Sequence, residues 1–292
     1  MMTLLLVALA AQDYPGDMPI SRVLIDGEGW QLVSEGHQFT EGPAADREGN
    51  VYFSDIPASK IHKVDLAGKV TLFAENTAKT NGLMVGPDGR LYGCRNGEKK
   101  IVSYGMDGSV QTVAEEVESN DIVVNSAGDV YFSDPPGGRI WFIPHGGKAK
   151  VVAEKLKPNG LILTPDEGTL VVTDSTDPHL WTFRVEADGA LAHKDRYYQP
   201  LRMVEGRKGT GADGMTVDKA GRLYVATAAG LQMFDPTGRL GGVIAKPQEK
   251  SLSNVVFGGR DFAFLYVTST DKVYRRKTQS PGAPYFLHAK PR

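Results

Sequence analysis

The chain has 292 residues, a net charge of −2 at pH 7 and a single cysteine. Its acidic and basic residues are interspersed, so it lacks the basic stripe that neutralises nucleic-acid phosphates, and nucleic acid is excluded as an expected partner. One cysteine cannot form an internal disulfide, and we expect Cys94 to pack as a small hydrophobe within its strand.

The N-terminal residues resemble an export signal. Their apolar run is too short to span a bilayer, and Ala8, Leu9 and Ala10 fit a small-x-small cleavage site, although the usual basic region is missing. We expect residues 1–19 to form a signal peptide and disordered tail, followed by one domain over residues 20–292. The protein would then be periplasmic or secreted, with a cytoplasmic location as the alternative. No other segment is apolar enough to suggest a membrane partner.

A similar strand pattern recurs about every forty residues, a period typical of propellers. It occurs at 51–55, 91–93, 130–134, 170–174, 223–225 and 265–268. In the first unit, further strands are expected at 42–45, 60–64 and 70–73, between turns rich in Gly, Asp and Pro. The repeat predicts an all-β fold, a six-bladed β-propeller with four-stranded blades.

Two segments fall outside the regular repeat. Residues 30–34 precede the first full unit, and we expect them to complete the last blade, because an open ring would leave an unpaired sheet edge. The spacing lengthens between Asp174 and Asp213, where residues 197–210 form a polar insertion. This insertion is either a solvated loop or a lid over the site, since long loops in compact domains are often functional.

An oxygen-bearing residue precedes each repeated strand. These residues are Glu41, Asn81, Asn120, Asn159, Asp213 and Asn254. The first strand of a propeller blade lies nearest the axis, so the six side chains are expected at one mouth of the channel. The antiparallel second strands return to the same mouth and end there in an outer ring of possible substrate contacts: Asp55, Arg95 with Asn96, Asp134, Asp174, Thr227 and Ser269.

The inner ring predicts a divalent-metal site. Hard oxygen donors without Cys or His favour calcium, with zinc, manganese or magnesium as alternatives. The competing interpretation is that each Asn merely caps backbone groups at a turn. The six histidines are scattered and show no zinc spacing. His37 precedes Glu41 and is expected at the surface or in a loop, with a position at the mouth as the alternative.

Several of these residues lie in motifs that resemble the senescence marker protein, gluconolactonase and luciferin-regenerating enzyme family. The motifs are Glu41-Gly42-Pro43, Asn120-Asp121, Pro158-Asn159-Gly160-Leu161, residues 213–218 and residues 254–268. The resemblance covers about residues 30–276 and implies a six-bladed, divalent-metal lactonase acting on sugar lactones. It implies that Glu41, Asn159 and Asp213 bind the metal, while Asn120 lies at the metal and touches substrate.

The resemblance has one departure. Animal members carry a substrate-binding arginine two residues before the position of Asn120, where this chain has Glu118, which cannot donate hydrogen bonds as arginine does. The sugar specificity of those members is therefore not carried over. Arg95 from the neighbouring blade is a candidate to supply a guanidinium instead, or it forms a blade-edge ion pair.

The expected reaction is hydrolysis of a small-molecule sugar lactone. Asp213 would accept the proton as the catalytic base, with Glu41 as the alternative, and Asn81, Arg95, Asn96 and Asn120 would bind substrate. We expect a monomer or weak oligomer. The alternative function is a non-catalytic propeller that uses calcium to stiffen a binding platform, because the propeller fold hosts both roles.

Overall fold

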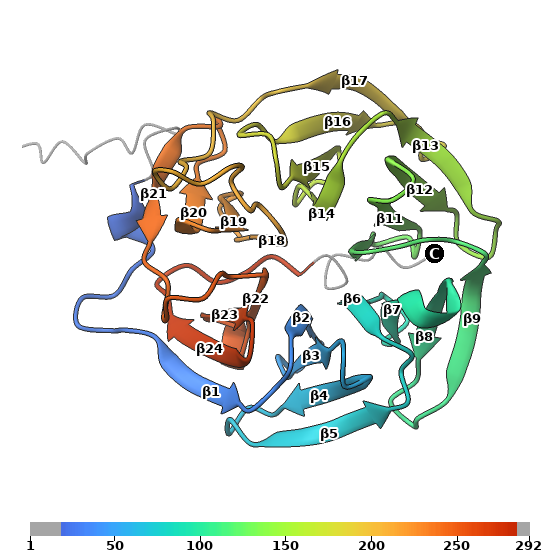
Figure 1. Cartoon of the computed structure of the whole chain (residues 1–292), viewed down its shortest axis with the longest axis horizontal. Coiled ribbons are helices and arrows are strands. Elements are labelled where there is room, and N and C mark those ends of the chain that lie inside the picture. Colours follow the sequence, from blue (N-terminus) through green and yellow to red (C-terminus); the bar gives the residue numbers. More distant parts are fainter. Residues whose placement is uncertain (1–18, 285–292) are drawn as a thin grey trace, which may run out of the picture.

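The computed structural model describes residues 19–284, which form six four-stranded antiparallel sheets around a central axis (Figure 1). The predicted six-bladed propeller is confirmed. The expected signal peptide lies outside the described residues, apart from residue 19, and so do the last eight residues of the expected domain, 285–292. Along the ring, the innermost strands contact one another in the order β2, β6, β10, β14, β18 and β22, and β22 returns to β2.

The first three blades follow the chain directly. The first contains β2 (Thr40–Ala45), β3 (Val51–Asp55), β4 (Lys60–Val64) and β5 (Val70–Glu75). The second contains β6 (Thr80–Val85), β7 (Leu91–Arg95), β8 (Lys100–Tyr104) and β9 (Val110–Glu115). The third contains β10 (Ile122–Val124), β11 (Val130–Asp134), β12 (Arg139–Ile143) and β13 (Lys150–Glu154).

The next two blades keep this order, and the last one does not. The fourth contains β14 (Pro158–Leu163), β15 (Thr169–Asp174), β16 (Trp181–Val185) and β17 (Leu191–Asp195). The fifth contains β18 (Met215–Val217), β19 (Leu223–Thr227), β20 (Gly230–Phe234) and β21 (Leu240–Ile244). The sixth combines β22 (Asn254–Gly258), β23 (Phe264–Ser269) and β24 (Lys272–Lys277) with β1 (Gln31–Glu35).

Strand β1 closes the ring. It pairs antiparallel with β24, from Gln31 opposite Arg275 to Glu35 opposite Lys272. The outer strand of the last blade therefore comes from the start of the chain, as predicted, and the edge of β24 is covered. The pairing therefore joins the first strand of the described chain to its last strand.

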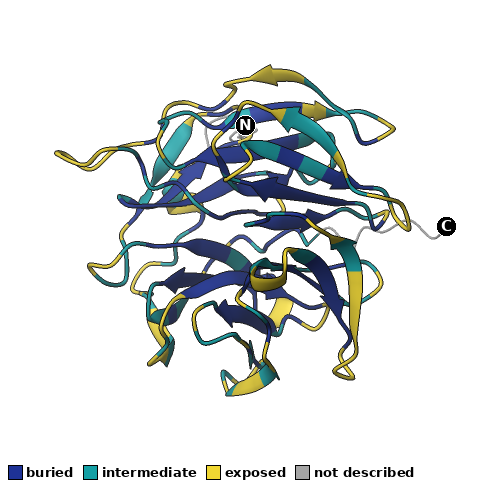
Figure 2. Cartoon of the chain, turned by 45° about the vertical axis from the view of Figure 1, so that its right-hand side comes forward, coloured by how far each residue is buried: buried dark blue, intermediate teal, exposed yellow. Residues whose placement is uncertain are grey.

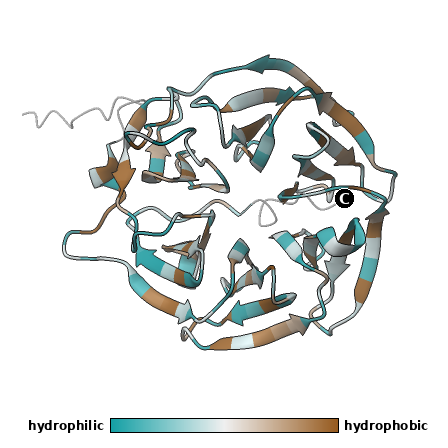
Figure 3. Cartoon of the chain, viewed as in Figure 1, coloured by the Kyte–Doolittle hydropathy of each residue, from teal (hydrophilic) through white to brown (hydrophobic). Residues whose placement is uncertain are grey.

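Burial decreases from the axis outward. The second strands β3, β11 and β19 are buried throughout, whereas the outer strands β5 and β9 are partly exposed (Figure 2). Hydrophobic residues occur on strands of all six blades (Figure 3). The core thus lies between neighbouring sheets, which explains why the central strands need apolar or aromatic side chains on both faces.

Helical structure is limited to three single turns within residues 19–284: η1 (Ile20–Arg22), η2 (Asn96–Glu98) and η3 (Arg260–Phe262). No helix in this range has the length and apolar character needed to cross a membrane.

The 197–210 insertion is partly packed against the fourth and fifth blades. Tyr198 and Leu201 are buried, and the Gln232 side chain of β20 exchanges hydrogen bonds with the backbone of Arg202 (both 2.8 Å). Beyond this anchor, Met203 and Val204 are 48% and 42% exposed. The insertion is therefore anchored at its first half and exposed at its tip.

Candidate active site

Three of the six ring residues lie at an irregularity near the start of an innermost strand. In β2, β6 and β14 the pairing with the second strand slips at Glu41, Asn81 and Asn159, respectively, so that each lies at a β-bulge. A bulge increases the local twist and re-aims a side chain, and bulges are frequent beside active sites. It recurs in three blades and re-aims Glu41, Asn81 and Asn159 at the starts of their strands.

Glycine follows the ring residue in four blades, and the packing explains why. A Cβ atom on Gly42 would lie 2.3 Å from the carbonyl oxygen of Asn81, and one on Gly160 would lie 2.2 Å from that of Asp213. The innermost strands therefore approach each other more closely than any side chain allows. In the third blade the equivalent position is Asp121, which brings an additional carboxylate to the ring.

Glu41, Asp121 and Asn254 meet at the centre of the ring. The Asn254 amide nitrogen donates to Glu41 Oε2 (3.2 Å) and to Asp121 Oδ2 (3.4 Å). Its carbonyl oxygen accepts the backbone N–H of Val255 (2.8 Å), which fixes the orientation of the amide. Backbone N–H groups of Gly42 and Ile122 also bond to the Glu41 and Asp121 carboxylates. One amide from the sixth blade thus bridges two buried acids that come from the first and third blades.

Asp213 completes a group of three neighbouring carboxylates. Burial raises its pKa well above the usual value, and the negative charges of Glu41 and Asp121 raise it further. Burial also raises the pKa of Glu41 to about 8, with the Asp121 charge as the next cause, and raises the pKa of Asp121 to about 6. Three neighbouring buried acids with raised pKa values form a site that favours a cation.

Asn159 faces the same group with an unused acceptor. Its amide nitrogen donates to Ser175 Oγ (2.9 Å), and its amide lowers the pKa of Asp213. Its carbonyl oxygen Oδ1 is buried and has no hydrogen-bond partner. A buried acceptor without a donor is unfavourable unless a cation or water satisfies it. The donor set of carboxylates and this free amide oxygen fits a hard divalent cation.

The other predicted site residues lie around this centre. Asn81 is buried at the start of β6, and Asn120 is half-buried just before β10. Asn96, in η2, accepts a hydrogen bond from Ser119 Oγ (3.0 Å). The Arg95 guanidinium binds Glu98 Oε1 (3.0 Å) and the backbone oxygen of Asn76 (3.1 Å). Arg95 thus forms the blade-edge ion pair that was the alternative to a substrate contact.

Glu118, at the position that departs from the family pattern, forms an ion pair with Lys99 Nζ (2.7 Å). Both side chains are exposed, at 43% and 64% respectively. The pair presents a mixed charge near the mouth in place of a single guanidinium.

The carboxylates of the outer ring hold the turns that follow the second strands. Asp134 accepts hydrogen bonds from the backbone N–H of Gly137 (2.7 Å) and from Trp141 Nε1 (3.1 Å). Asp174 accepts from Thr176 through both its backbone N–H and its hydroxyl. Asp134 therefore uses both of its oxygens within the protein and Asp174 uses Oδ1, which leaves the inner-ring acids as the candidates on the axis.

Asp121 is the functional candidate that sequence analysis did not assign. It lies one residue outside the regular spacing that relates the six ring residues. The signal was the replacement of the recurrent glycine by an acid one residue after Asn120. Asn254 was noticed as a ring member, but its role as the bridge between Glu41 and Asp121 depends on contacts across the axis.

An apolar cavity extends from the site along the axis. It is lined by side chains of the innermost strands, with Asp121 and Asn254 among them, and by Ala283 and Pro284. The backbone N–H of Ala283 donates to the oxygen of Val217 (3.3 Å). The C-terminal end of the described chain thus lies against β18 beside this cavity and contributes apolar surface to it.

Comparison with known proteins gives a consistent result. The family model described as SMP-30/Gluconolactonase/LRE-like region matches residues 39–271. A gluconolactonase of Zymomonas mobilis is 26% identical, covering 86% of this chain and 82% of that protein. A lactonase drp35 of Staphylococcus haemolyticus is 27% identical, covering 69% and 67%.

Among solved structures, a gluconolactonase from Xanthomonas campestris superposes with a TM-score of 0.77 at 25% identity, covering 91% of this chain and 95% of that chain. A luciferin-regenerating enzyme has a TM-score of 0.75 at 19% identity, covering 89% and 99%, a level of likeness that reflects the shared fold.

Proposed function

The chain belongs to the SMP-30/Gluconolactonase/LRE-like family, and on that premise we propose that it is a divalent-metal-dependent lactonase that opens a sugar lactone. The relatives named gluconolactonase and lactonase support the reaction class. The observation that carries the metal dependence is the buried, unpartnered Oδ1 of Asn159 beside three buried carboxylates.

Glu41, Asn159 and Asp213 are the proposed metal ligands, with Asn120 at the edge of the site. When bound, a divalent ion polarises the ring carbonyl and stabilises the negative charge that develops on its oxygen. Oxygen donors alone favour calcium, and magnesium, manganese and zinc are the alternatives. Asp121 contributes a further negative charge, which strengthens the attraction for a cation.

Asp213 is the proposed proton acceptor. The Glu41 and Asp121 carboxylates are held by backbone N–H groups and by the Asn254 amide. Asp213 interacts with the Asn159 amide, and no backbone donor within residues 19–284 holds its carboxylate. It is therefore the acid best able to take the proton of the attacking water as the acyl C–O bond of the lactone breaks. The product is the open-chain hydroxy acid.

The amides near the mouth suit a polyhydroxylated substrate. Asn81, Asn96 and Asn120 offer both donors and acceptors, which pair with sugar hydroxyls. Arg95 stays a candidate at the edge of the site, with its Nη2 held by Glu98 and by the backbone oxygen of Asn76.

The test combines metal removal with two substitutions. Metal-free protein should open glucono-lactone only after a divalent ion is restored. Asp213→Asn should lower kcat by at least about 100-fold, as expected for loss of a general base. Asn159→Leu should weaken metal binding by at least about tenfold with the fold retained.

An exposed substitution, Gln111→Ala on β9, serves as the control and should leave both quantities unchanged. Full activity in demetallated protein would overturn the metal-dependent mechanism. Tight metal binding without opening of any aldono-lactone would support the non-catalytic platform instead.

A further inference from the structure

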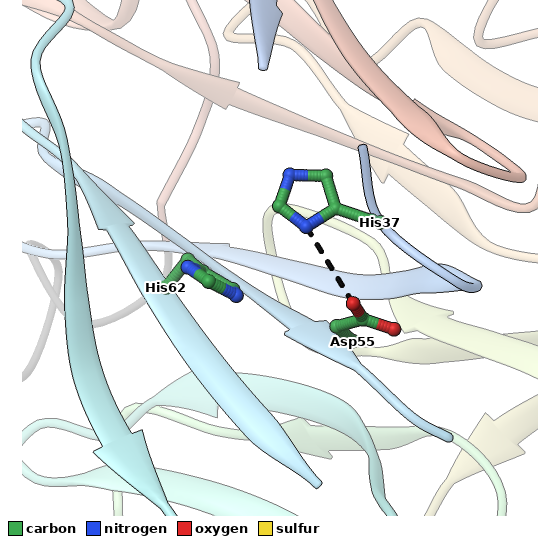
Figure 4. A group of neighbouring side chains, drawn as sticks. All are labelled: His37, Asp55 and His62. Atoms are coloured by element: carbon green, nitrogen blue, oxygen red, sulfur yellow. Dashed lines mark ion pairs between the residues drawn. The ribbon is translucent and has the colours of Figure 1, made fainter. Parts of the chain in front are cut away.

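A second group of metal-ligating side chains lies away from the inner ring. His37, Asp55 and His62 each offer a ligand atom, and these atoms all lie within 4.8 Å of one another (Figure 4). His37 Nδ1 lies 3.6 Å from Asp55 Oδ2. The three residues come from the segment between β1 and β2, the end of β3 and the middle of β4. The two histidines show no zinc spacing because they belong to different elements.

The sheet register explains why the side chains converge. Phe53 on β3 lies opposite His62 on β4, and Asp55 lies opposite Lys60. Residues two apart on a strand share a face, so Asp55 and His62 are diagonal neighbours on the same face of the first blade. Phe53 packs with residues of the last blade, which identifies this face as the one turned toward the closing seam of the ring.

His37 reaches the pair from the seam itself. It directly follows β1, the strand that closes the last blade, and its backbone N–H donates to the oxygen of Asp271 (3.2 Å). It lies in a loop, which agrees with one part of the expectation, but only 9% of its side chain is exposed, so it is not a surface histidine. Because β1 is the outermost strand of the last blade, the chain that leaves it places His37 beside Asp55 and His62 instead of in the inner ring.

Each of the three side chains is held by a neighbour. His37 Nε2 lies 2.7 Å from Ser34 Oγ, which orients the ring with Nδ1 toward Asp55. The Asp55 carboxylate accepts the backbone N–H groups of Gln38 and Phe39. The His62 ring stacks on Phe53 with a centroid distance of 5.2 Å. Within residues 19–284 no hydrogen bond engages the ring nitrogens of His62. Contacts like those made by Ser34, Phe53 and the backbone N–H groups commonly hold metal-ligating side chains in one orientation.

We propose that His37, Asp55 and His62 form a second cation site, which takes a divalent transition metal ion such as zinc and is separate from the oxygen-donor site on the axis. Two imidazoles and a carboxylate are the donor set that such ions prefer over calcium. In a tetrahedral zinc site, bonds of about 2.1 Å place neighbouring donor atoms about 3.4 Å apart. The observed 3.6 Å separation of His37 Nδ1 and Asp55 Oδ2 is close to that value and is long for a hydrogen bond. His62 is partly exposed, which leaves room for water as the fourth ligand.

The proposed second site lies where the first blade meets the last. An ion held there would join β3 and β4 of the first blade to the chain that has just left β1 of the last blade. It would therefore tie the seam at which the two ends of the chain close the ring. A ligand that binds only the folded state raises stability according to its concentration. We expect zinc to stabilise the protein through this seam, independently of turnover.

The experiment uses the metal-free full-length chain with excess calcium, which occupies the oxygen-donor site. Zinc is titrated by calorimetry, and cobalt is added in parallel to report coordination through its visible absorption. The wild-type protein should bind one zinc ion with a rise in Tm, and X-ray absorption of the zinc complex should show two imidazole ligands. The inner ring contains no histidine, so this signature identifies the second site.

His62→Phe keeps an aromatic ring against Phe53 and removes both nitrogens, so folding should be retained. It should weaken zinc binding by at least about tenfold and abolish the zinc-dependent rise in Tm. His37→Gln provides an independent variant with the same expected loss. His145→Gln, at an exposed histidine, is the matched control and should bind as the wild type does.

Unchanged zinc affinity in both His62→Phe and His37→Gln would overturn the proposal, as would a zinc complex without imidazole ligands. Because none of these measurements uses lactone hydrolysis, the second site can fail while the proposed lactonase activity stands, and the reverse also holds.

Discussion

At the scale of single residues, Asp121 adds a third carboxylate to a site that already contains Glu41 and Asp213. It occupies the position that glycine holds in four of the other blades, and its carboxylate shares the Asn254 amide with Glu41. Two effects oppose each other there. Without a cation, a third buried acid is unfavourable; with a cation, it adds attraction.

Asp121→Asn should therefore raise the stability of the metal-free protein and lower its affinity for metal. Removing one buried charge should stabilise the metal-free protein by about 1–3 kcal/mol. It should also weaken divalent-metal binding about 10- to 100-fold, as changes beside metal ligands commonly do. Urea unfolding of the metal-free protein and calorimetric titration measure the two effects. Asp261→Asn makes the same charge change at an exposed position and is the control. A variant that is destabilised and binds metal normally would show that Asp121 has a purely structural role.

At the scale of elements, the turn between the first and second strands connects the local sequence to the packing of blades. In the first blade, Asp46 Oδ1 accepts the backbone N–H groups of Glu48 and Asn50, and the Tyr52 hydroxyl donates to Oδ2 (3.1 Å). The turn also contacts the last blade, because the N–H of Gly259 donates to the oxygen of Gly49 (2.7 Å). The element is thus both a turn and a contact between blades.

Gly49→Ala should be clearly more destabilising than Gly89→Ala, the same change in the equivalent turn of the second blade. Both glycines have positive φ, at +92° and +79°, which costs an L-residue about 1–2 kcal/mol. A Cβ atom at position 49 would also lie 2.2 Å from the oxygen of Gly259, whereas one at position 89 meets nothing within 4 Å. The overpacked variant should lose about 1–3 kcal/mol more. Equal losses in denaturant unfolding would contradict the proposed contact between blades.

At the scale of the whole molecule, stability depends on closing the ring. Strand β1 covers the edge of β24, and Val33 of β1 packs against the core shared by the last blade and its neighbours. An uncovered edge strand exposes a row of backbone donors and acceptors to other chains. Closure therefore protects against association as well as unfolding.

A chain that begins at Gly36 should lose this protection, whereas one that begins at Pro19 keeps every described strand. The shorter chain should unfold at a lower temperature and form oligomers through the exposed edge of β24. Calorimetry and light scattering after size-exclusion chromatography measure both effects. If the two chains were equally stable and monomeric, β1 would be dispensable for closure.

The sequence by itself determined the repeat, the number of blades, the closing strand and the oxygen-bearing residues Glu41, Asn159 and Asp213. Each follows from local periodicity, because hydrophobic alternation and turn residues are set by neighbours along the chain. The tertiary structure alone decided which side chains meet across the axis and the seam. Asp121 joins Glu41 through Asn254, and His37 meets Asp55 and His62, because bulges and strand register direct side chains that no spacing in the sequence relates.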